Sequence, residues 1–392
     1  MRIVFVFSQR ASWLGGISFY YNLFNSIKSE TTSQKPTLVG FIFKGDTLPE
    51  NVRNQLDEIY EIDESGLAGK AIMRISGYFS GKKSLAWLRP ESSISRMARR
   101  VKADVIFLKE APLARFRVPT VCWFPDFQFV HMPEMFPPDI LGDYQKDAVN
   151  MARYATRLML SSQSALHDFE RILPQYLYKV RVVPFVAWVD DSVFRDDPGR
   201  VIQEYHLPRK FFYLPNQFWQ HKNHRIVLDA LELALKHDTK ITIVASGGLS
   251  DFRNPSYPSE VVAEIARRGL RDHFILLGII PHQEVYALCR ASIAIIQPSL
   301  FEGWSTSIEE AKSLGKRVIA SNLDVHREQN ALGSMFFERH DPEELAGLLI
   351  KAYEKLTPGP DPMAEATARK NMHERAQIYR KAFMDLLTEA TT

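Results

Sequence analysis

Short hydrophobic runs alternate along the chain with longer segments in which apolar residues recur every three or four positions. Hydrophobic runs of this length are typical of buried β-strands. They predict twelve strands, namely Ile3–Phe7, Thr37–Phe43, Val105–Leu108, Thr120–Phe124, Arg157–Leu160, Lys179–Pro184, Phe211–Leu214, Lys240–Ala245, Phe274–Leu277, Ile293–Gln297, Arg317–Ala320 and Met335–Phe337. Regular alternation of strand and helix predicts parallel sheets with helices on both faces.

The segments between the strands carry the helical pattern. The clearest are Tyr20–Lys28, Asp147–Tyr154, Ile226–Lys236, Ser259–Arg268 and Pro342–Leu356. Twelve strands are too many for one open, twisted sheet. The sequence therefore predicts an α/β protein with two doubly wound, Rossmann-like domains.

The alternation of predicted strands and helices is interrupted where we expect the boundary between the two domains. Residues 188–207 contain charges and the Pro198–Gly199 pair but no hydrophobic run. We interpret them as a linker, because Pro and Gly interrupt regular structure. The first domain then covers 1–187 and the second domain covers 208–363.

A second pause, rich in proline, comes at 357–362. It precedes a long charged helix, Ala364–Leu387. A helix left over after a complete domain can pack on the other domain. We therefore expect about 364–392 to pack back on the N-terminal domain.

Composition narrows the function classes. Of 392 residues, 45% are hydrophobic and 24% are charged, which is ordinary for a folded protein, and the net charge of +3 argues against a global nucleic-acid binder. The only cysteines, Cys122 and Cys289, fit a reducing compartment and have no zinc-ligand spacing. No apolar stretch suits a signal peptide or approaches the ~20 residues of a membrane span, so we expect a cytoplasmic protein.

The most informative stretch, 301–311, reads FEGWSTSIEEA. It follows the strand that ends at Gln297. Thr306 and Glu309 match a capping box, which predicts a helix start near Ser305. A strand-to-helix loop offers free N–H groups and the positive end of the helix dipole to an anion.

Two carboxylates border this predicted anion site. Glu302 lies in the loop and Glu310 in the first turns of the helix. Their placement suits hydroxyl groups on either side of a phosphate. The alternative is that Glu309 and Glu310 only interact with the helix dipole.

A second stretch, 214–224, also lies between a predicted strand and a predicted helix. Lys222 is placed to neutralise phosphate oxygens as a point charge. Asn223 is a candidate N-cap. The alternative is a solvated lysine.

Two further stretches follow strands. Gly15 and Gly16 form a loop before the first helix, where glycine lets a backbone approach a ligand, although the dinucleotide fingerprint G-x-G-x-x-G is absent. Asp126 follows a strand at the crevice position of an open α/β sheet. The alternative is that Asp126 starts a turn and that His131 packs in a loop.

Together these stretches resemble family 4 of the retaining glycosyltransferases, which have the GT-B fold with two domains facing a central cleft. Glu302 and Glu310 match the family motif Glu-x7-Glu within PSLFEGWSTSIEEAKSLGKRVIAS. The resemblance covers essentially the whole chain and is strongest from Tyr213 to Ser321. The flanking positions that also fit are Pro298, Gly303, Ala311 and Gly315.

The resemblance implies roles for these residues in binding a nucleotide-sugar donor. Glu302 would contact hydroxyls of the transferred sugar, and Glu310 would accept hydrogen bonds from the ribose. Lys222 would hold the diphosphate together with backbone groups of Ser305–Ser307.

The remaining candidate positions concern loop closure and the sugar. The loop with Gly16 would close over donor and acceptor. Asp126 lies near the place where the family often has a histidine that touches the sugar, with His131 as the second candidate. Two positions depart from the family pattern, because Gln217 replaces an arginine and Trp304 replaces a small apolar residue.

The implied reaction is transfer of a hexosyl group from a nucleotide-sugar to a saccharide or lipid-linked acceptor with retention of configuration, in surface polysaccharide, lipopolysaccharide or glycolipid biosynthesis. The helix N-terminus and Lys222 would stabilise the leaving diphosphate, so no metal cofactor is expected. A sugar-nucleotide epimerase of similar fold is one alternative. A non-catalytic donor-binding protein is another, because the family's arginine is missing.

A basic segment adds a prediction about location. Residues 70–102 contain nine basic residues and one acid, Glu91, with interleaved aromatic side chains. This composition suits an anionic membrane surface, where a lipid-linked acceptor would be presented. The alternative is a solvated basic face.

Overall fold

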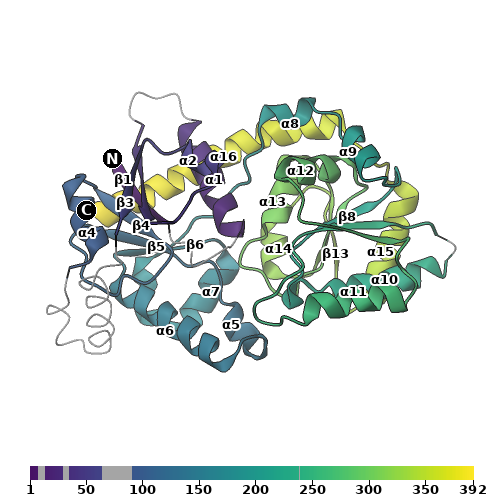
Figure 1. The fold of residues 1–392 in the computed structure, drawn as a ribbon, viewed down its shortest axis with the longest axis horizontal. Helices are drawn as coiled ribbons and strands as arrows, with labels where there is room; N and C mark the ends of the chain where they lie inside the picture. Colours follow the sequence, from purple (N-terminus) through teal and green to yellow (C-terminus); the bar gives the residue numbers. More distant parts are fainter. Residues whose placement is uncertain (8–13, 30–34, 64–90, 238) are drawn as a thin grey trace. The chain divides into compact units, whose positions relative to one another are not determined.

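The computed structural model describes residues 1–7, 14–29, 35–63, 91–237 and 239–392. These residues form two compact units, and Figure 1 shows helices on both faces of the sheet in each unit. The first unit consists of Met1–Phe127, Pro138–Val186 and Arg375–Thr392, and the second of Gln128–Pro137 and Ala187–Glu374.

The first unit is built on a seven-stranded parallel sheet in the order β3-β2-β1-β4-β5-β6-β7. Its central strands are buried on both faces, as their continuous apolar sequences require. The strands are β1 (Arg2–Phe7), β2 (Thr37–Phe43), β3 (Glu58–Ile62), β4 (Val105–Leu108), β5 (Thr120–Trp123), β6 (Arg157–Leu160) and β7 (Val180–Val182).

The helices of the first unit connect these strands. They are α1 (Leu14–Lys28), α2 (Glu50–Arg53), α4 (Ser93–Arg100), α6 (Pro138–Tyr154) and α7 (Gln163–Ile172), with a 3₁₀ helix η3 (Pro174–Lys179). Helix α1 begins earlier than predicted and includes Gly15 and Gly16 in its first turn, so the predicted glycine loop is wrong at these positions.

The C-terminal helix α16 (Pro362–Thr391) completes the core of the first unit. Phe383 on α16 packs against Phe5 of β1 and Phe107 of β4, with ring centroids 6.4 and 5.5 Å away. Arg181 on β7 and Glu389 on α16 form an ion pair of 2.8 Å at the surface. The predicted return of this helix to the N-terminal domain is confirmed.

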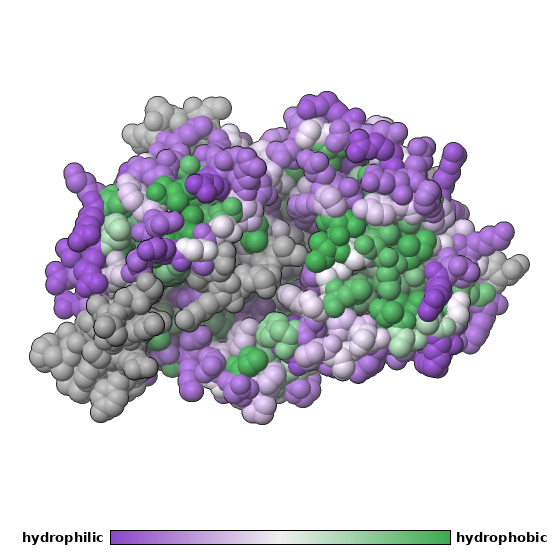
Figure 2. Space-filling view, viewed as in Figure 1, coloured by the Kyte–Doolittle hydropathy of each residue, from purple (hydrophilic) through white to green (hydrophobic). Residues whose placement is uncertain are grey.

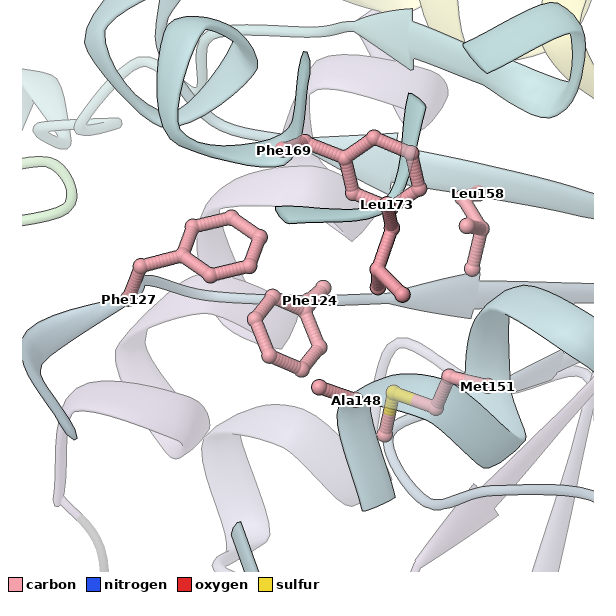
Figure 3. Close-up of a pocket in the computed structure, with 7 residues that line it drawn as sticks. All are labelled: Phe124, Phe127, Ala148, Met151, Leu158, Phe169 and Leu173. Atoms are coloured by element: carbon pink, nitrogen blue, oxygen red, sulfur yellow. The ribbon is translucent and has the colours of Figure 1, made fainter. Parts of the chain in front are cut away.

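Apolar side chains from α6, α7, β6 and the segment after β5 form a cluster in the first unit (Figure 3). The rings of Phe124 and Phe127 are 4.6 Å apart at their centroids. The side chains leave no space for a water molecule. The cluster is therefore packed core and not a ligand site; its members are Phe124, Phe127, Ala148, Met151, Leu158, Phe169 and Leu173.

The second unit contains a six-stranded parallel sheet in the order β10-β9-β8-β11-β12-β13. The strand order reverses at β8, as in the doubly wound folds that bind nucleotides. The strands are β8 (Phe212–Pro215), β9 (Ile243–Ser246), β10 (Phe274–Gly278), β11 (Ile295–Gln297), β12 (Val318–Ser321) and β13 (Met335–Phe337).

Helices cover both faces of this second sheet (Figure 1). The apolar faces of α10, α11 and α15 contribute to one large core cluster with the strands. The helices are α5 (Gln128–His131), α8 (Asp191–Arg195), α9 (Gly199–Glu204), α10 (His224–Leu235), α11 (Tyr257–Arg267), α12 (His282–Ala291), α13 (Thr306–Ser313), α14 (Asp324–Gln329) and α15 (Pro342–Lys355), with 3₁₀ helices η2 (Pro133–Met135) and η4 (Gln220–Lys222).

Residues 188–207, the predicted linker, contain α8 and α9 and are part of the second unit. Arg290 of α12 fixes this segment. Its guanidinium donates to the carbonyl oxygens of Val193 and Asp196 at 2.5 and 2.8 Å, and to Glu365 Oε1 of α16 at 2.8 Å. The segment is ordered because these buried bonds satisfy its backbone.

The surface of the second unit is hydrophobic in one broad area of the view in Figure 2. Strand β10 forms an edge of the sheet, and Ile275 and Leu276 are partly exposed there. None of the helices in the described part of the chain has the length and apolar composition of a membrane span. Most of the basic segment 70–102 lies outside the described residues; Glu91 pairs with Arg99 at 3.0 Å.

Candidate active site

The candidate site lies at the carboxyl ends of two neighbouring strands of the second unit. Strands β8 and β11 pair in parallel, although β9 and β10 come between them in the sequence. The loops 216–223 and 298–305 therefore leave the sheet side by side at its switch point. In open α/β sheets this is where ligands bind.

Three contacts fasten these two loops together. The Leu300 N–H donates to the His221 carbonyl oxygen at 2.8 Å. Asn223 Nδ2 donates to the carbonyl oxygens of Pro298 and Arg339 at 3.2 and 3.0 Å. Asn223 occupies the N-cap position of α10, as predicted, with a left-handed backbone (φ 56°), but its side chain makes no hydrogen bond to the helix. Its amide holds the loops together instead.

The third contact joins two of the predicted site residues. Lys222 Nζ lies 2.5 Å from Glu302 Oε1, and the two side chains are only 15% and 9% exposed. Gln297 Nε2 and Ser299 Oγ also donate to Glu302 Oε1, at 2.9 and 2.6 Å. Three donors on one oxygen hold the carboxylate in one orientation.

Helix α13 begins at the predicted place but with a different cap. Ser305 Oγ accepts from the Ile308 N–H at 3.4 Å, whereas Glu309 bonds Lys312 and Gln329, so the predicted capping box of Thr306 and Glu309 is wrong. Glu309 is nearly fully buried, and its carboxylate pairs with Lys312 instead of accepting a backbone N–H at the start of the helix. The N–H groups of the helix's first turn, at Thr306 and Ser307, have no intrahelical acceptor.

Gln329 of α14 braces the loop before this helix. Its amide accepts from the Ser305 N–H at 3.1 Å and donates to the Ser305 carbonyl oxygen at 2.9 Å. Ser307 Oγ donates to the Pro215 carbonyl oxygen at 3.2 Å, which links α13 to the end of β8. Gly303 and Trp304 lie between Glu302 and this braced residue.

Glu310 faces a histidine that the sequence did not single out. His282, the first residue of α12, donates from Nε2 to Glu310 Oε1 at 2.8 Å. Glu310 is buried, whereas the His282 side chain is 46% exposed. Burial lowers the pKa of His282, but the hydrogen bond and the charge of Glu310 outweigh it, so the pKa is raised.

Gln217 is anchored by the neighbouring β9 loop. Its Oε1 accepts from the Gly248 N–H at 2.8 Å. A β-carbon on Gly247 would lie 2.2 Å from the Asn216 carbonyl oxygen, so only glycine fits this approach. Because a backbone N–H must meet the carbonyl oxygen of the amide, the NH₂ end of Gln217 is the end left to meet a ligand.

Arg253 holds the segment 128–137 in the second unit. Its Nη1 donates to Gln128 Oε1 at 2.8 Å, and the guanidinium lies 5.3 Å from the ring centroids of Phe136 and Trp219. In the same segment, the His131 ring is 5.0 Å from the Phe301 ring. His131 therefore contacts the residue directly before Glu302.

The structure divides the predicted site residues between the two units. Asp126 lies beyond the carboxyl end of β5 in the first unit, together with Gly15 and Gly16. The second unit contains His131, Gln217, Lys222, Glu302, Gly303, Trp304, Ser305, Thr306, Ser307 and Glu310.

Sequence reasoning missed the residues that orient the two glutamates. Gln297 ends a buried strand, and Ser299 follows two residues later. A polar residue at the end of an apolar strand is the sequence pattern that could have indicated a role for them. His282 follows Pro281 at a helix start. Gln329 gave no signal, because nothing local shows that it reaches α13. In the described part of the chain, no group of three His, Cys, Asp or Glu residues could hold a metal ion.

Three buried histidines surround the site. Burial lowers the pKa of His326 to about 4 and that of His224 to about 3, and it also lowers the pKa of His221. His326 Nδ1 lies 2.9 Å from the Ser321 carbonyl oxygen, which requires a proton on Nδ1. The folded protein therefore keeps this imidazole neutral at pH 5.

We expect His326→Asn to reduce the pH dependence of stability. In the unfolded chain the imidazole takes up a proton near pH 6.5, while the folded imidazole stays neutral down to about pH 4, so stability falls as the pH drops through this window. Between pH 6 and pH 5, removing His326 should reduce the change in the free energy of unfolding by about 1.4 kcal/mol per pH unit. Urea unfolding at pH 6 and at pH 5 measures this change in the free energy of unfolding. His237→Ala, at an exposed position, should leave the slope unchanged; an unchanged slope for His326→Asn contradicts the prediction.

Residues 201–376 match the family model described as Glycosyl transferases group 1. The matched residues lie almost entirely within the second unit. The O-antigen chain mannosyltransferase B of Escherichia coli is 26% identical over 211 residues, which cover 52% of this chain and 53% of that protein. The chain spans about half the length of this curated relative.

Solved structures share the fold over the whole chain. HepE of Anabaena, in complex with UDP and glucose, has a TM-score of 0.69 at 17% identity, covering 99% of both chains. A glycosyltransferase from Rickettsia africae has a TM-score of 0.68 at 17% identity, covering 99% of this chain and 98% of that chain. At this identity the likeness shows the fold, and it confirms the predicted GT-B class.

Proposed function

We propose that the protein is a retaining glycosyltransferase of the family 4 type, which moves a sugar from a nucleotide-sugar donor to a saccharide or lipid-linked acceptor. The observation that carries the proposal is the contact between Lys222 and Glu302 at the switch point of the second sheet, with Glu310 in the helix that follows. The group 1 domain match supports it. HepE, whose fold this chain shares, was solved with UDP and glucose.

The diphosphate of the donor is proposed to lie at the start of α13. The free N–H groups of Thr306 and Ser307 and the helix dipole favour an anion there. Lys222 brings a positive charge from the adjacent loop, and the NH₂ end of Gln217 adds a neutral donor where the family has arginine. We propose no metal cofactor, since these groups supply the positive potential.

Charge explains how this arrangement accelerates transfer. As the glycosidic bond to the diphosphate breaks, the departing oxygen becomes negative and the sugar ring becomes positive. Lys222 and the helix N-terminus stabilise the negative charge on the departing oxygen. The Glu302 carboxylate faces the positive charge on the sugar ring. Low exposure strengthens both interactions, because little water screens them. The acceptor's proton leaves with the departing diphosphate.

His131 is the stronger of the two remaining catalytic candidates. It contacts Phe301, the residue before Glu302, while Asp126 belongs to the other unit. We propose an acceptor from surface polysaccharide biosynthesis, because the curated relative is named for O-antigen chains. Docking of 70–102 on an anionic membrane stays a prediction.

A donor screen followed by a transfer assay tests the proposed function. We expect one nucleotide-sugar to raise the melting temperature by mass action and to be consumed when a glycan acceptor is added. Glu310→Ala should weaken donor binding by about 1–3 kcal/mol, because a buried hydroxyl contact is lost. Glu302→Gln should lower turnover more than binding. Glu354→Ala, an exposed change on α15, is the matched control and should alter neither.

Two outcomes contradict the proposal. Conversion of the free donor into an epimer without transfer to any acceptor would identify an epimerase. Wild-type transfer rates for both glutamate variants at subsaturating donor would place the reaction elsewhere. Product anomers, resolved by NMR, test retention.

A further inference from the structure

The pair of His282 and Glu310 is a contact between two helices that the proposed chemistry does not use. Glu310 belongs to α13 and His282 begins α12, which follows β10. Nε2 of the imidazole lies 2.8 Å from Glu310 Oε1. The interaction therefore fixes one oxygen of the carboxylate and leaves the other oxygen available to a ligand.

The imidazole is itself held in place. Its ring packs on Tyr286, one turn further along α12, with ring centroids 4.4 Å apart. The hydroxyl of Tyr286 lies 3.5 Å from the Trp188 carbonyl oxygen. His282 thus has a defined rotamer before any ligand arrives, although nearly half of its side chain is exposed.

The charged groups nearby leave Glu310 as the main partner of the imidazole. Glu284 on the same helix bonds the Tyr205 hydroxyl of α9 at 2.6 Å. The hydrogen bond to Glu310 and its charge together keep the pKa of His282 above its ordinary value against the effect of burial. Either protonation state of the imidazole can carry the N–H that Glu310 accepts.

We propose that His282 is a positioning residue that orients Glu310 for the nucleoside of the donor. The inference rests on the proposed function, in which Glu310 accepts hydrogen bonds from ribose hydroxyls. A carboxylate that already has its orientation loses less rotamer freedom when the ribose binds. His282 should therefore affect nucleoside recognition and leave diphosphate binding alone.

Calorimetry with UDP, GDP, ADP, CDP and inorganic pyrophosphate tests this inference. With the nucleoside diphosphate that binds wild type most tightly, we expect His282→Ala to raise the Kd about three- to tenfold, the worth of one hydrogen bond. Pyrophosphate should bind the variant as it binds wild type. His282→Gln, which keeps an N–H donor, should stay within about twofold of wild type.

A double-variant comparison asks whether His282 acts through Glu310. In the Glu310→Ala background, adding His282→Ala should change the Kd no further. His237→Ala, at an exposed histidine of the same unit, should leave every Kd unchanged and serves as the control. Unchanged melting temperatures confirm that the variants are folded.

The failures are distinguishable. If wild type binds none of the nucleoside diphosphates, the proposed function is overturned. If it binds one, and His282→Ala weakens pyrophosphate equally or acts independently of Glu310, the positioning role is overturned while the proposed function stands.

Discussion

Replacing Lys222 by alanine is expected to reduce kcat/KM for sugar transfer by about 100- to 1,000-fold, the usual cost of losing one group that stabilises developing negative charge. Lys222 lies in the loop after β8, and its ammonium group contacts the Glu302 carboxylate. The variant also leaves the Glu302 carboxylate, 9% exposed, without its cation. Both effects act on the same reaction step. Steady-state kinetics with the donor from the screen measures the loss.

Binding measurements separate the charge effect from misfolding. The Kd of the nucleoside diphosphate should rise much more than that of the nucleoside, because the charge matters only when phosphates are present. Lys236→Ala, at an exposed lysine near the end of α10, is the matched control. Equal losses for nucleoside and diphosphate would indicate a folding defect, and a folded variant that keeps more than a tenth of the activity would remove Lys222 from the mechanism.

Replacing Arg290 by methionine is expected to lower the free energy of unfolding by about 3–5 kcal/mol. The side chain is 4% exposed and pairs with Glu365, which is 11% exposed. Methionine fills much of the volume, but it leaves the Glu365 carboxylate without the cation that hydrogen-bonds it. It also removes the donors to the Val193 and Asp196 carbonyl oxygens. Chemical denaturation followed by circular dichroism measures the change.

The matched control for Arg290 is another ion pair in the same chain. Lys381 and Asp385 lie on the surface of α16, 76% and 58% exposed, and their nitrogen and oxygen are 2.7 Å apart. Lys381→Ala should cost no more than about 0.5 kcal/mol, because water screens exposed charges. Adding Glu365→Gln to the Arg290→Met variant should restore part of the stability. Equal costs for the two ion pairs would show that burial is not the cause.

The sheets could be predicted from the sequence because most strands are buried on both faces. All twelve predicted strands are present, with ends shifted by at most a few residues. The missed strand, β3, lies at the sheet edge and reads EIYEI. Its two glutamates interrupt the apolar residues, whereas β10, which is also an edge strand, reads FILLG and was predicted.

The candidate site residues were chosen from local patterns in the sequence. Glu302 and Lys222 stand in strand-to-helix loops, and Glu310 lies in the helix that follows one of them. The partners that orient them come from other strands and helices, as Gln329 and His282 show. Such long-range contacts depend on packing, which one sequence does not display.

Helix caps show most clearly where tertiary contacts differ from what neighbouring residues predict. Thr306 and Glu309 have the spacing of a capping box, but Lys312 and Gln329 compete for Glu309, and Ser305 provides the cap. Asn223 has a residue type that caps helices, but two carbonyl oxygens from other loops take its amide. Glu309 thus pairs with Lys312 on its own helix and with the distant Gln329, and both partners of the Asn223 amide are distant in the sequence.

The position of Phe383 has a consequence for how the chain is made. Its ring completes the packing around Phe5 and Phe107, so the core of the first unit needs residues that lie more than 270 positions apart in the sequence. A ribosome adds about 5–20 residues per second, so the nascent N-terminal sheet waits on the order of tens of seconds for that ring. During translation this half of the protein stays open to chaperones until α16 has been made.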